Sequence, residues 1–149
     1  MVNYWTVGAW NIRHALRNGV AGEWMIDLVH PVKQNDKALV YVLKESPYNP
    51  SGKGAGCFVS DFTIDSDPII IKGPWIYAEH DYSEKGGHEG FRLRDFKLWE
   101  CFVDKDEVRQ HLPNFRLSML RSSKCVLQIS RETYLKIIDM YAKKIEEAK

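Results

Sequence analysis

Residues 37–44 read KALVYVLK, and residues 55–64 read AGCFVSDFTI. The first run is almost continuously apolar, which is typical of a strand buried at the centre of a sheet. The second alternates apolar and polar side chains, which is typical of a strand with one buried face. Residues 45–54, between them, are rich in Pro, Ser, Gly and Lys and predict a turn or hairpin loop. The two strands should therefore pair antiparallel.

Strand signals continue on both sides of this pair. Residues 2–7 (VNYWTV) predict a first strand, and residues 124–129 predict a last one. Residues 91–102 (FRLRDFKLWECF) predict a long strand whose alternation slips once near Asp95, as a β-bulge would cause. Residues 65–90 are interrupted by glycines and prolines and predict only short extended pieces.

Three helices are expected around these strands. Asn11 is a suitable N-cap for a short helix that ends at Gly19. Asp104 and Glu107 form the capping-box pattern of a second short helix, and Ser130 caps a final amphipathic helix. The sum predicts an α+β domain built around a small curved, mostly antiparallel sheet or barrel.

The composition is that of one globular domain, 1–149, with a net charge of only +1, which speaks against a protein that coats nucleic acid through bulk charge. No run approaches the roughly 18 apolar residues of a membrane span, and no signal-peptide pattern precedes the first strand. Cys57, Cys101 and Cys125 form an odd, widely spaced set without a CxxC pair. This pattern favours inert thiols in a reducing, cytoplasmic compartment and speaks against structural zinc. No cofactor motif is present.

Positive charge is concentrated late in the chain. Residues 108–131 contain five Lys or Arg side chains and no acid. We expect a basic rim that contacts a few phosphates. The predicted phosphate contacts are Arg116, Arg121, Ser122, Ser123 and Lys124. A scatter of charges over a solvated surface remains the alternative.

Five tryptophans are the most informative feature of the composition. Trp5 and Trp99 alternate with polar neighbours in strand-like runs and are expected in the core. Trp24 and Trp75 follow glycine-containing stretches in predicted loops, where large flat rings suit the walls of a pocket for a nucleobase. Trp10, at a helix start, fits either a packing role or the same pocket.

One cluster could support catalysis. His80, Asp81 and Glu84 lie close together with His88, as a metal site or a general base would require. The surrounding stretch is polar and glycine-rich, so an exposed loop is the competing interpretation, and we expect no enzymatic activity. A small hydrolase or nuclease that uses His80, Asp81 and Glu84 is the alternative. His14, in the middle of the first helix, is expected at the surface.

The order of the pieces resembles a known family. The matching stretches are Asn3-Tyr4-Trp5, Gly22-Glu23-Trp24, 32–36 (VKQND), 38–44 (ALVYVLK), 56–62 (GCFVSDF), 91–99 and 120–134 (LRSSKCVLQISRETY). Over nearly its whole length the chain resembles an EVE domain of the PUA-like superfamily. The same order is similar to the YTH domain, a relative that reads methylated adenine.

The resemblance implies a closed, strongly curved sheet with a pocket that receives a flipped, modified base. It places Trp24 and Trp75 as aromatic walls, although Met-Ile-Asp follows Trp24 where EVE relatives more often continue with Gly, and Trp75 matches by position only. Residues after the first strand would line the pocket, and the side-chain amide among them would read the base. These residues are Gly8, Ala9, Trp10 and Asn11. The implied function is a non-enzymatic module that reads a modified, methylated base in DNA or RNA, without metal, cofactor or membrane.

Overall fold

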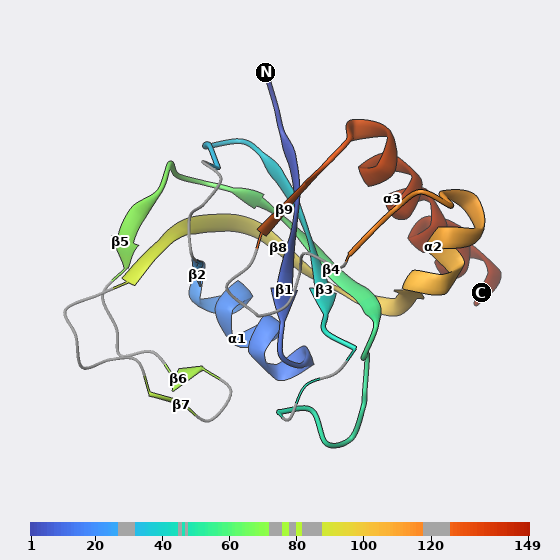
Figure 1. Cartoon of the computed structure of the whole chain (residues 1–149), viewed down its shortest axis with the longest axis horizontal. Coiled ribbons are helices and arrows are strands. Elements are labelled where there is room, and N and C mark those ends of the chain that lie inside the picture. Colours follow the sequence, from blue (N-terminus) through green and yellow to red (C-terminus); the bar gives the residue numbers. More distant parts are fainter. Residues whose placement is uncertain are drawn as a thin grey trace.

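A strongly curled mixed sheet is the centre of the fold (Figure 1). The computed structural model describes residues 1–26, 32–44, 46, 48–71, 76–77, 80–81, 88–117 and 126–149, with the backbone alone at 76–77, 80–81 and 88. Within these residues the strands follow the order β2-β8-β4-β3-β1-β9, with β5 paired to β8 beside this path. The strands of this sheet are β1 (Tyr4–Ala9), β2 (Glu23–Met25), β3 (Lys37–Val42), β4 (Cys57–Ile64), β5 (Ile69–Ile71), β8 (His88–Asp104) and β9 (Val126–Ile129).

The predicted central pair is confirmed. Strands β3 and β4 pair antiparallel, with Ala38 opposite Phe62. Strands β1 and β3 run parallel, because helix α1 (Ile12–Ala21) and strand β2 lie in the crossover between them. All other described pairs are antiparallel, so the prediction of a mostly antiparallel sheet is also confirmed.

The slip in the long strand is a real bulge. Asp95 has a φ of 56°, in the left-handed region. Arg94 pairs with Thr63 of β4, and Lys97 pairs with Asp61. Between these two pairs, β8 therefore contains one more residue than β4. The extra residue exchanges the two faces of β8, since every later side chain points to the other side of the sheet.

The helix caps follow the sequence, with one correction. Asn11 caps α1, Ser130 caps α3 (Arg131–Glu147), and the Asp104 capping box opens α2 (Lys105–His111). The predicted end of α1 at Gly19 is wrong, because the helix continues to Ala21 and Gly22 takes the left-handed C-cap, with φ 75°. A Cβ atom on Gly19 would lie 2.3 Å from the Phe96 ring, so this glycine allows close packing and does not end the helix.

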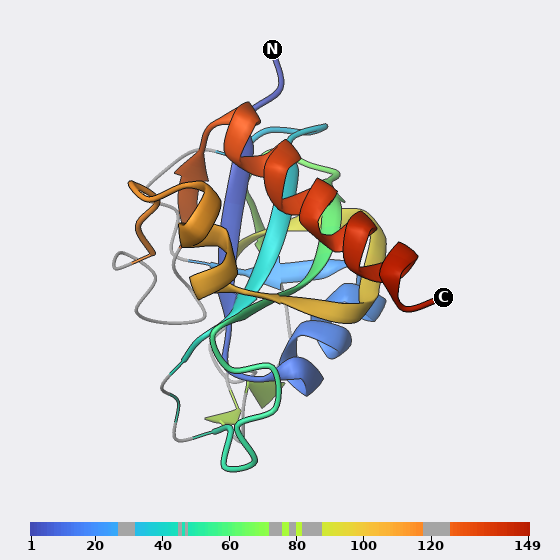
Figure 2. The ribbon, with the colours of Figure 1, turned by 90° about the vertical axis from the view of Figure 1, so that its right-hand side faces the viewer.

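Helices cover both faces of the sheet, as Figure 2 shows. The face that packs against α1, here called the α1 face, buries one apolar cluster that includes Trp5, Trp24 and Phe62. The opposite face, here called the α3 face, is covered by α2 and α3 and buries a second cluster that includes Trp99 and Tyr141. This arrangement confirms the α+β class and the curved sheet with flanking helices.

Candidate nucleic-acid-binding site

Three buried tryptophans differ in what their indole N–H groups contact. On Trp5, Nε1 donates to Asp36 at 2.8 Å, and on Trp99, Nε1 donates to Asp61 at 2.6 Å. Trp24 is 0% exposed, yet its Nε1 has no hydrogen-bond partner in the described part of the chain. The prediction that Trp5 and Trp99 lie in the core is confirmed. Trp24 is buried too, but its indole N–H lacks a described partner, and this difference marks the candidate site.

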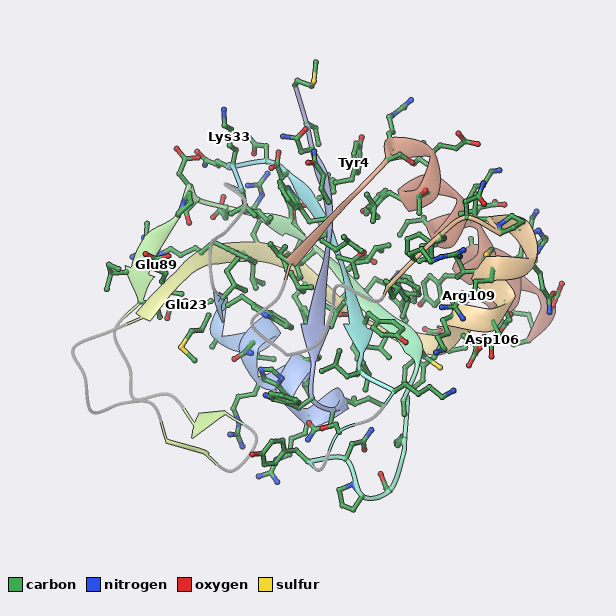
Figure 3. The ribbon with its side chains drawn as sticks, viewed as in Figure 1. Tyr4, Glu23, Lys33, Glu89, Asp106 and Arg109 are labelled. Atoms are coloured by element: carbon green, nitrogen blue, oxygen red, sulfur yellow. The ribbon has the colours of Figure 1, made fainter. Side chains whose placement is uncertain are left out.

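The predicted loop position of Trp24 is wrong. Trp24 lies in the short strand β2, opposite Phe91 of β8, and its strand neighbour Glu23 marks the position in Figure 3. The indole lies between two rings, with centroids 5.6 Å from Phe62 and 5.7 Å from His14. Strand pairing turns the side chain inward, so the ring does not stand open as a stacking wall in this structure.

His14 is also inside, against the prediction of a surface residue. Its ring is 4% exposed, and its Nδ1 accepts a hydrogen bond from the backbone N–H of Trp10 at 3.0 Å. Burial, with a smaller contribution from the nearby Arg17, lowers the pKa of His14 to about 3. The ring is therefore neutral at physiological pH, and because Nδ1 accepts, its proton is on Nε2.

Two further polar side chains share this interior. Asn18 lies one turn after His14 on the buried side of α1, and Ser60 precedes Phe62 by two residues on the α1 face of β4. Within the described residues, Nδ2 of Asn18 and Oγ of Ser60 are buried without a hydrogen-bond partner. We call His14, Asn18, Trp24 and Ser60 the interior polar cluster.

Unpartnered buried groups are costly. Each one loses its hydrogen bonds to water, at a cost of about 1–3 kcal/mol. Native proteins keep such groups mainly where a water molecule, an ion or a ligand satisfies them. Trp24, Asn18 and Ser60 are therefore the described residues of the α1 face with polar atoms left to bond a guest.

Two of the residues predicted to follow the first strand belong to it, because β1 runs to Ala9. Gly8 and Ala9 are buried at the end of β1, and the Ala9 carbonyl accepts from the Leu43 N–H at 3.0 Å. Asn11 uses both ends of its side chain, since Oδ1 accepts from the His14 N–H at 2.7 Å and Nδ2 donates to the Tyr48 carbonyl at 2.7 Å. The structure thus gives Asn11 a capping role, and its role as base reader stays a prediction.

Most of the remaining predicted site residues lie outside the part of the chain that the structure describes. Trp75, Arg121, Ser122, Ser123, Lys124 and Glu84 lie outside the described residues. Arg116 is exposed and donates to the Pro113 carbonyl at 3.1 Å. Its neighbour Phe115 packs against the cluster of the α3 face, so Arg116 is not brought to the interior polar cluster.

The structure describes none of the side chains that the catalytic alternative would use. His80 and Asp81 form strand β7, which pairs with β6 (Ile76–Tyr77), and their side chains are not described. Among described residues, no group of three His, Cys, Asp or Glu side chains could hold a metal ion. Burial, with a smaller contribution from Asp104, raises the pKa of the Cys57 thiol to about 11, so this thiol is protonated near neutral pH.

No protein-family model matches this sequence, and no curated protein matches it. Solved structures do match. The fold is similar to that of ASCH from Zymomonas mobilis, with a TM-score of 0.55 and 13% identity over 92% of this chain and 94% of that one. It is also similar to the YTH domain of the Zygosaccharomyces rouxii MRB1 protein in complex with N6-methyladenosine RNA, with a TM-score of 0.57 and 13% identity over 94% and 86% of the two chains. The fold is PUA-like.

A hypothetical protein from Leishmania major matches this PUA-like fold with a TM-score of 0.64 and 13% identity, over 97% of both chains. At these identities the comparisons establish the architecture alone. None of the helices in the described residues is long and apolar enough to cross a membrane.

Sequence reasoning missed His14 and Asn18, although a signal was present. Ala15 and Gly19 are small residues one turn apart on α1, and such a pair lets a helix approach a sheet closely. His14 and Asn18 lie directly beside that pair. Leu16, an apolar residue of the same helix, is 41% exposed.

Proposed function

We propose that this chain is a non-enzymatic nucleic-acid-binding module that takes one modified, methylated base into the interior polar cluster. The observation that carries the proposal is the set of buried hydrogen-bonding atoms on Trp24, Asn18 and Ser60 that have no described partner. The PUA-like fold supports it, because one similar structure is a YTH domain bound to N6-methyladenosine RNA. The order of the sequence motifs supports assignment to the EVE group within that superfamily.

The chemistry of the cluster suits the edge of a nucleobase. Trp24 offers an N–H donor, Asn18 offers an amide, and Ser60 offers a hydroxyl that donates or accepts. A base flipped out of its strand presents ring nitrogens and exocyclic groups that match such donors and acceptors. A single methyl group contributes only about 1 kcal/mol through its buried area, so discrimination needs a site that closes tightly around it.

This proposal gives Trp24 a different role from the one expected. Because Phe62 and His14 pack near its ring, Trp24 would contact the base through its N–H edge. Trp75 stays the predicted stacking wall, and Arg121, Ser122, Ser123, Lys124 and Arg116 stay the predicted phosphate contacts. Such contacts would hold the strand without reading its sequence. We also propose a cytoplasmic location and a partner that is DNA or RNA.

A binding panel tests the proposal. Short single strands of DNA and RNA, each with one central N6-methyladenine or 5-methylcytosine, are compared with unmodified strands by fluorescence anisotropy at stated salt. We expect a preference for one modified strand, and Ser60→Ala and Trp24→Phe should reduce that preference. Thr6→Val is the matched control, because Thr6 has a buried, unpartnered hydroxyl in a strand position that faces the α3 face.

Equal binding of modified and unmodified strands would overturn the modified-base part of the proposal. Loss of preference in Thr6→Val as large as in Ser60→Ala would show that the cluster has no special role. The non-enzymatic part is tested by incubating the chain with the same strands and Mg²⁺. Turnover that disappears in His80→Ala would favour the hydrolase or nuclease.

A further inference from the structure

Two aromatic side chains lie at the end of β1, where Trp10 also packs against the cluster of the α3 face. Trp10 and Tyr48 are both half-buried, and their ring centroids are 5.2 Å apart in an edge-to-face arrangement. Trp10 directly follows β1, whereas Tyr48 belongs to the connection between β3 and β4. The pair therefore joins two segments that are far apart in the sequence.

The backbone holds this pair in place at three points. The Asn11 side chain donates to the Tyr48 carbonyl at 2.7 Å. Further along the same connection, Gly54 approaches Ile12 so closely that a Cβ atom would lie 2.9 Å from the Ile12 Cδ1. On the β3 side, the Leu43 N–H donates to the Ala9 carbonyl at 3.0 Å. The segments that carry the two rings are thus in contact at three described points.

The described charged side chains next to these contacts are all cations. Arg13 follows Ile12, Lys44 follows Leu43, and Lys53 precedes Gly54, and all three cations are exposed. The described residues of the three segments, 9–13, 43–44 and 48–56, include no acidic side chain. A half-buried aromatic pair among exposed cations has the composition of a surface that stacks bases and neutralises phosphates.

The aromatic pair is also connected to the interior polar cluster. The backbone N–H of Trp10 donates to Nδ1 of His14 at 3.0 Å, and the His14 ring lies 5.7 Å from that of Trp24. These two contacts join the backbone of Trp10 to the interior polar cluster.

We infer that Trp10 and Tyr48 form a stacking platform for the nucleotide next to the recognised base, with Arg13, Lys44 and Lys53 contacting its flanking phosphates. This inference rests on the proposed function and adds a second contact with the same single strand. Stacking on an aromatic ring tolerates every base, so the platform adds affinity without adding sequence preference.

The test uses the N6-methyladenine and 5-methylcytosine strands, each with the nucleotide on the 5′ or the 3′ side replaced by an abasic residue. Trp10→Leu should weaken binding of the intact strands roughly 5- to 100-fold, the range of one lost stacking contact. The abasic residue on one side should weaken binding to the natural chain by a similar factor, yet cause little further loss in Trp10→Leu. Trp10→Phe keeps a ring and should restore most of the affinity.

Tyr4→Leu is the control, because Tyr4 is a half-buried aromatic at the opposite end of β1, near the top of Figure 3. It should leave binding unchanged. Equal binding by Trp10→Leu and the natural chain, or equal abasic effects in both, would overturn the platform. If the natural chain binds without preferring a modified base, the proposed function fails, and the abasic comparison still tests the platform on unmodified strands. If it binds no strand, both fail.

Discussion

On the α3 face, buried polar atoms find partners in the fold. Trp99 donates to Asp61 at 2.6 Å, and the Tyr141 hydroxyl accepts from the Glu100 N–H at 3.1 Å while its ring stacks on Trp99 at 4.3 Å. On the α1 face, Trp5 donates to Asp36, but Nε1 of Trp24, Nδ2 of Asn18 and Oγ of Ser60 have no partner within the described residues. Thr6 is the exception, since its strand position directs an unpartnered hydroxyl to the α3 face.

In the proposed function, partnered groups hold the fold together, and groups without a described partner are left to contact a base. A buried polar pair fixes the way in which two elements pack, as Trp99 and Asp61 do for β8 and β4. A buried polar atom without a partner adds no hydrogen bond between two elements and costs free energy. Four predictions test this comparison.

Truncating an indole should be equally damaging on both faces. Trp24→Ala and Trp99→Ala should each lower the free energy of unfolding by about 3–5 kcal/mol, because both remove a large buried ring and leave a cavity. Chemical denaturation measures this change. A loss below about 1 kcal/mol for Trp24→Ala would mean that the indole is not part of the core.

Acid should destabilise the chain through the α1 face. The pKa of His14 is about 3 in the folded chain, against 6.5 when unperturbed. Between these values the unfolded chain binds a proton that the folded chain does not, so stability is complete above about pH 6.5 and falls as the pH is lowered. The contribution is about 1.4 kcal/mol per pH unit over that range.

His14→Gln removes this titration and keeps an acceptor for the Trp10 N–H. The difference in unfolding free energy between the natural chain and His14→Gln should therefore change with pH between about pH 6 and 4. A constant difference over that range would show that His14 is protonated in the folded chain or is not buried.

Replacing an indole by a phenyl ring should cost more stability at Trp99 than at Trp24. Trp99→Phe leaves the Asp61 carboxylate without its N–H donor and should cost about 1–3 kcal/mol beyond the change in packing. Trp24→Phe removes an N–H that has no described partner, so only the packing change should appear. Losses of equal size in denaturation experiments would contradict the comparison.

Removing an unpartnered hydroxyl should hardly affect stability on either face. Ser60→Ala and Thr6→Val should each change the unfolding free energy by less than about 0.5 kcal/mol or raise it slightly, because a buried polar group without a partner is removed. The two variants should differ in nucleic-acid binding alone, where only Ser60→Ala weakens it. Strong destabilisation by Ser60→Ala would reveal a structural partner for that hydroxyl.

Local chemistry in the sequence determined most of the elements. The caps at Asn11, Asp104 and Ser130 and the bulge at Asp95 were predicted correctly, because a side chain that bonds its own backbone, or a slip in alternation, acts within a few residues. Trp99 was placed in the core by the same kind of local period, and the structure confirms it.

The candidate site was decided by contacts between distant segments. Strand β2 has three residues, too few for a visible period, and only its pairing with β8 turns Trp24 inward. The side of α1 that carries His14 and Asn18 became the buried side because the sheet curls around it and Gly19 lets Phe96 approach. Sequence periodicity reports how apolar a helix face is, whereas the face that is buried depends on the shape of the surface that receives it. Local sequence patterns therefore predict the elements and their caps, whereas contacts between distant segments set which polar side chains are buried.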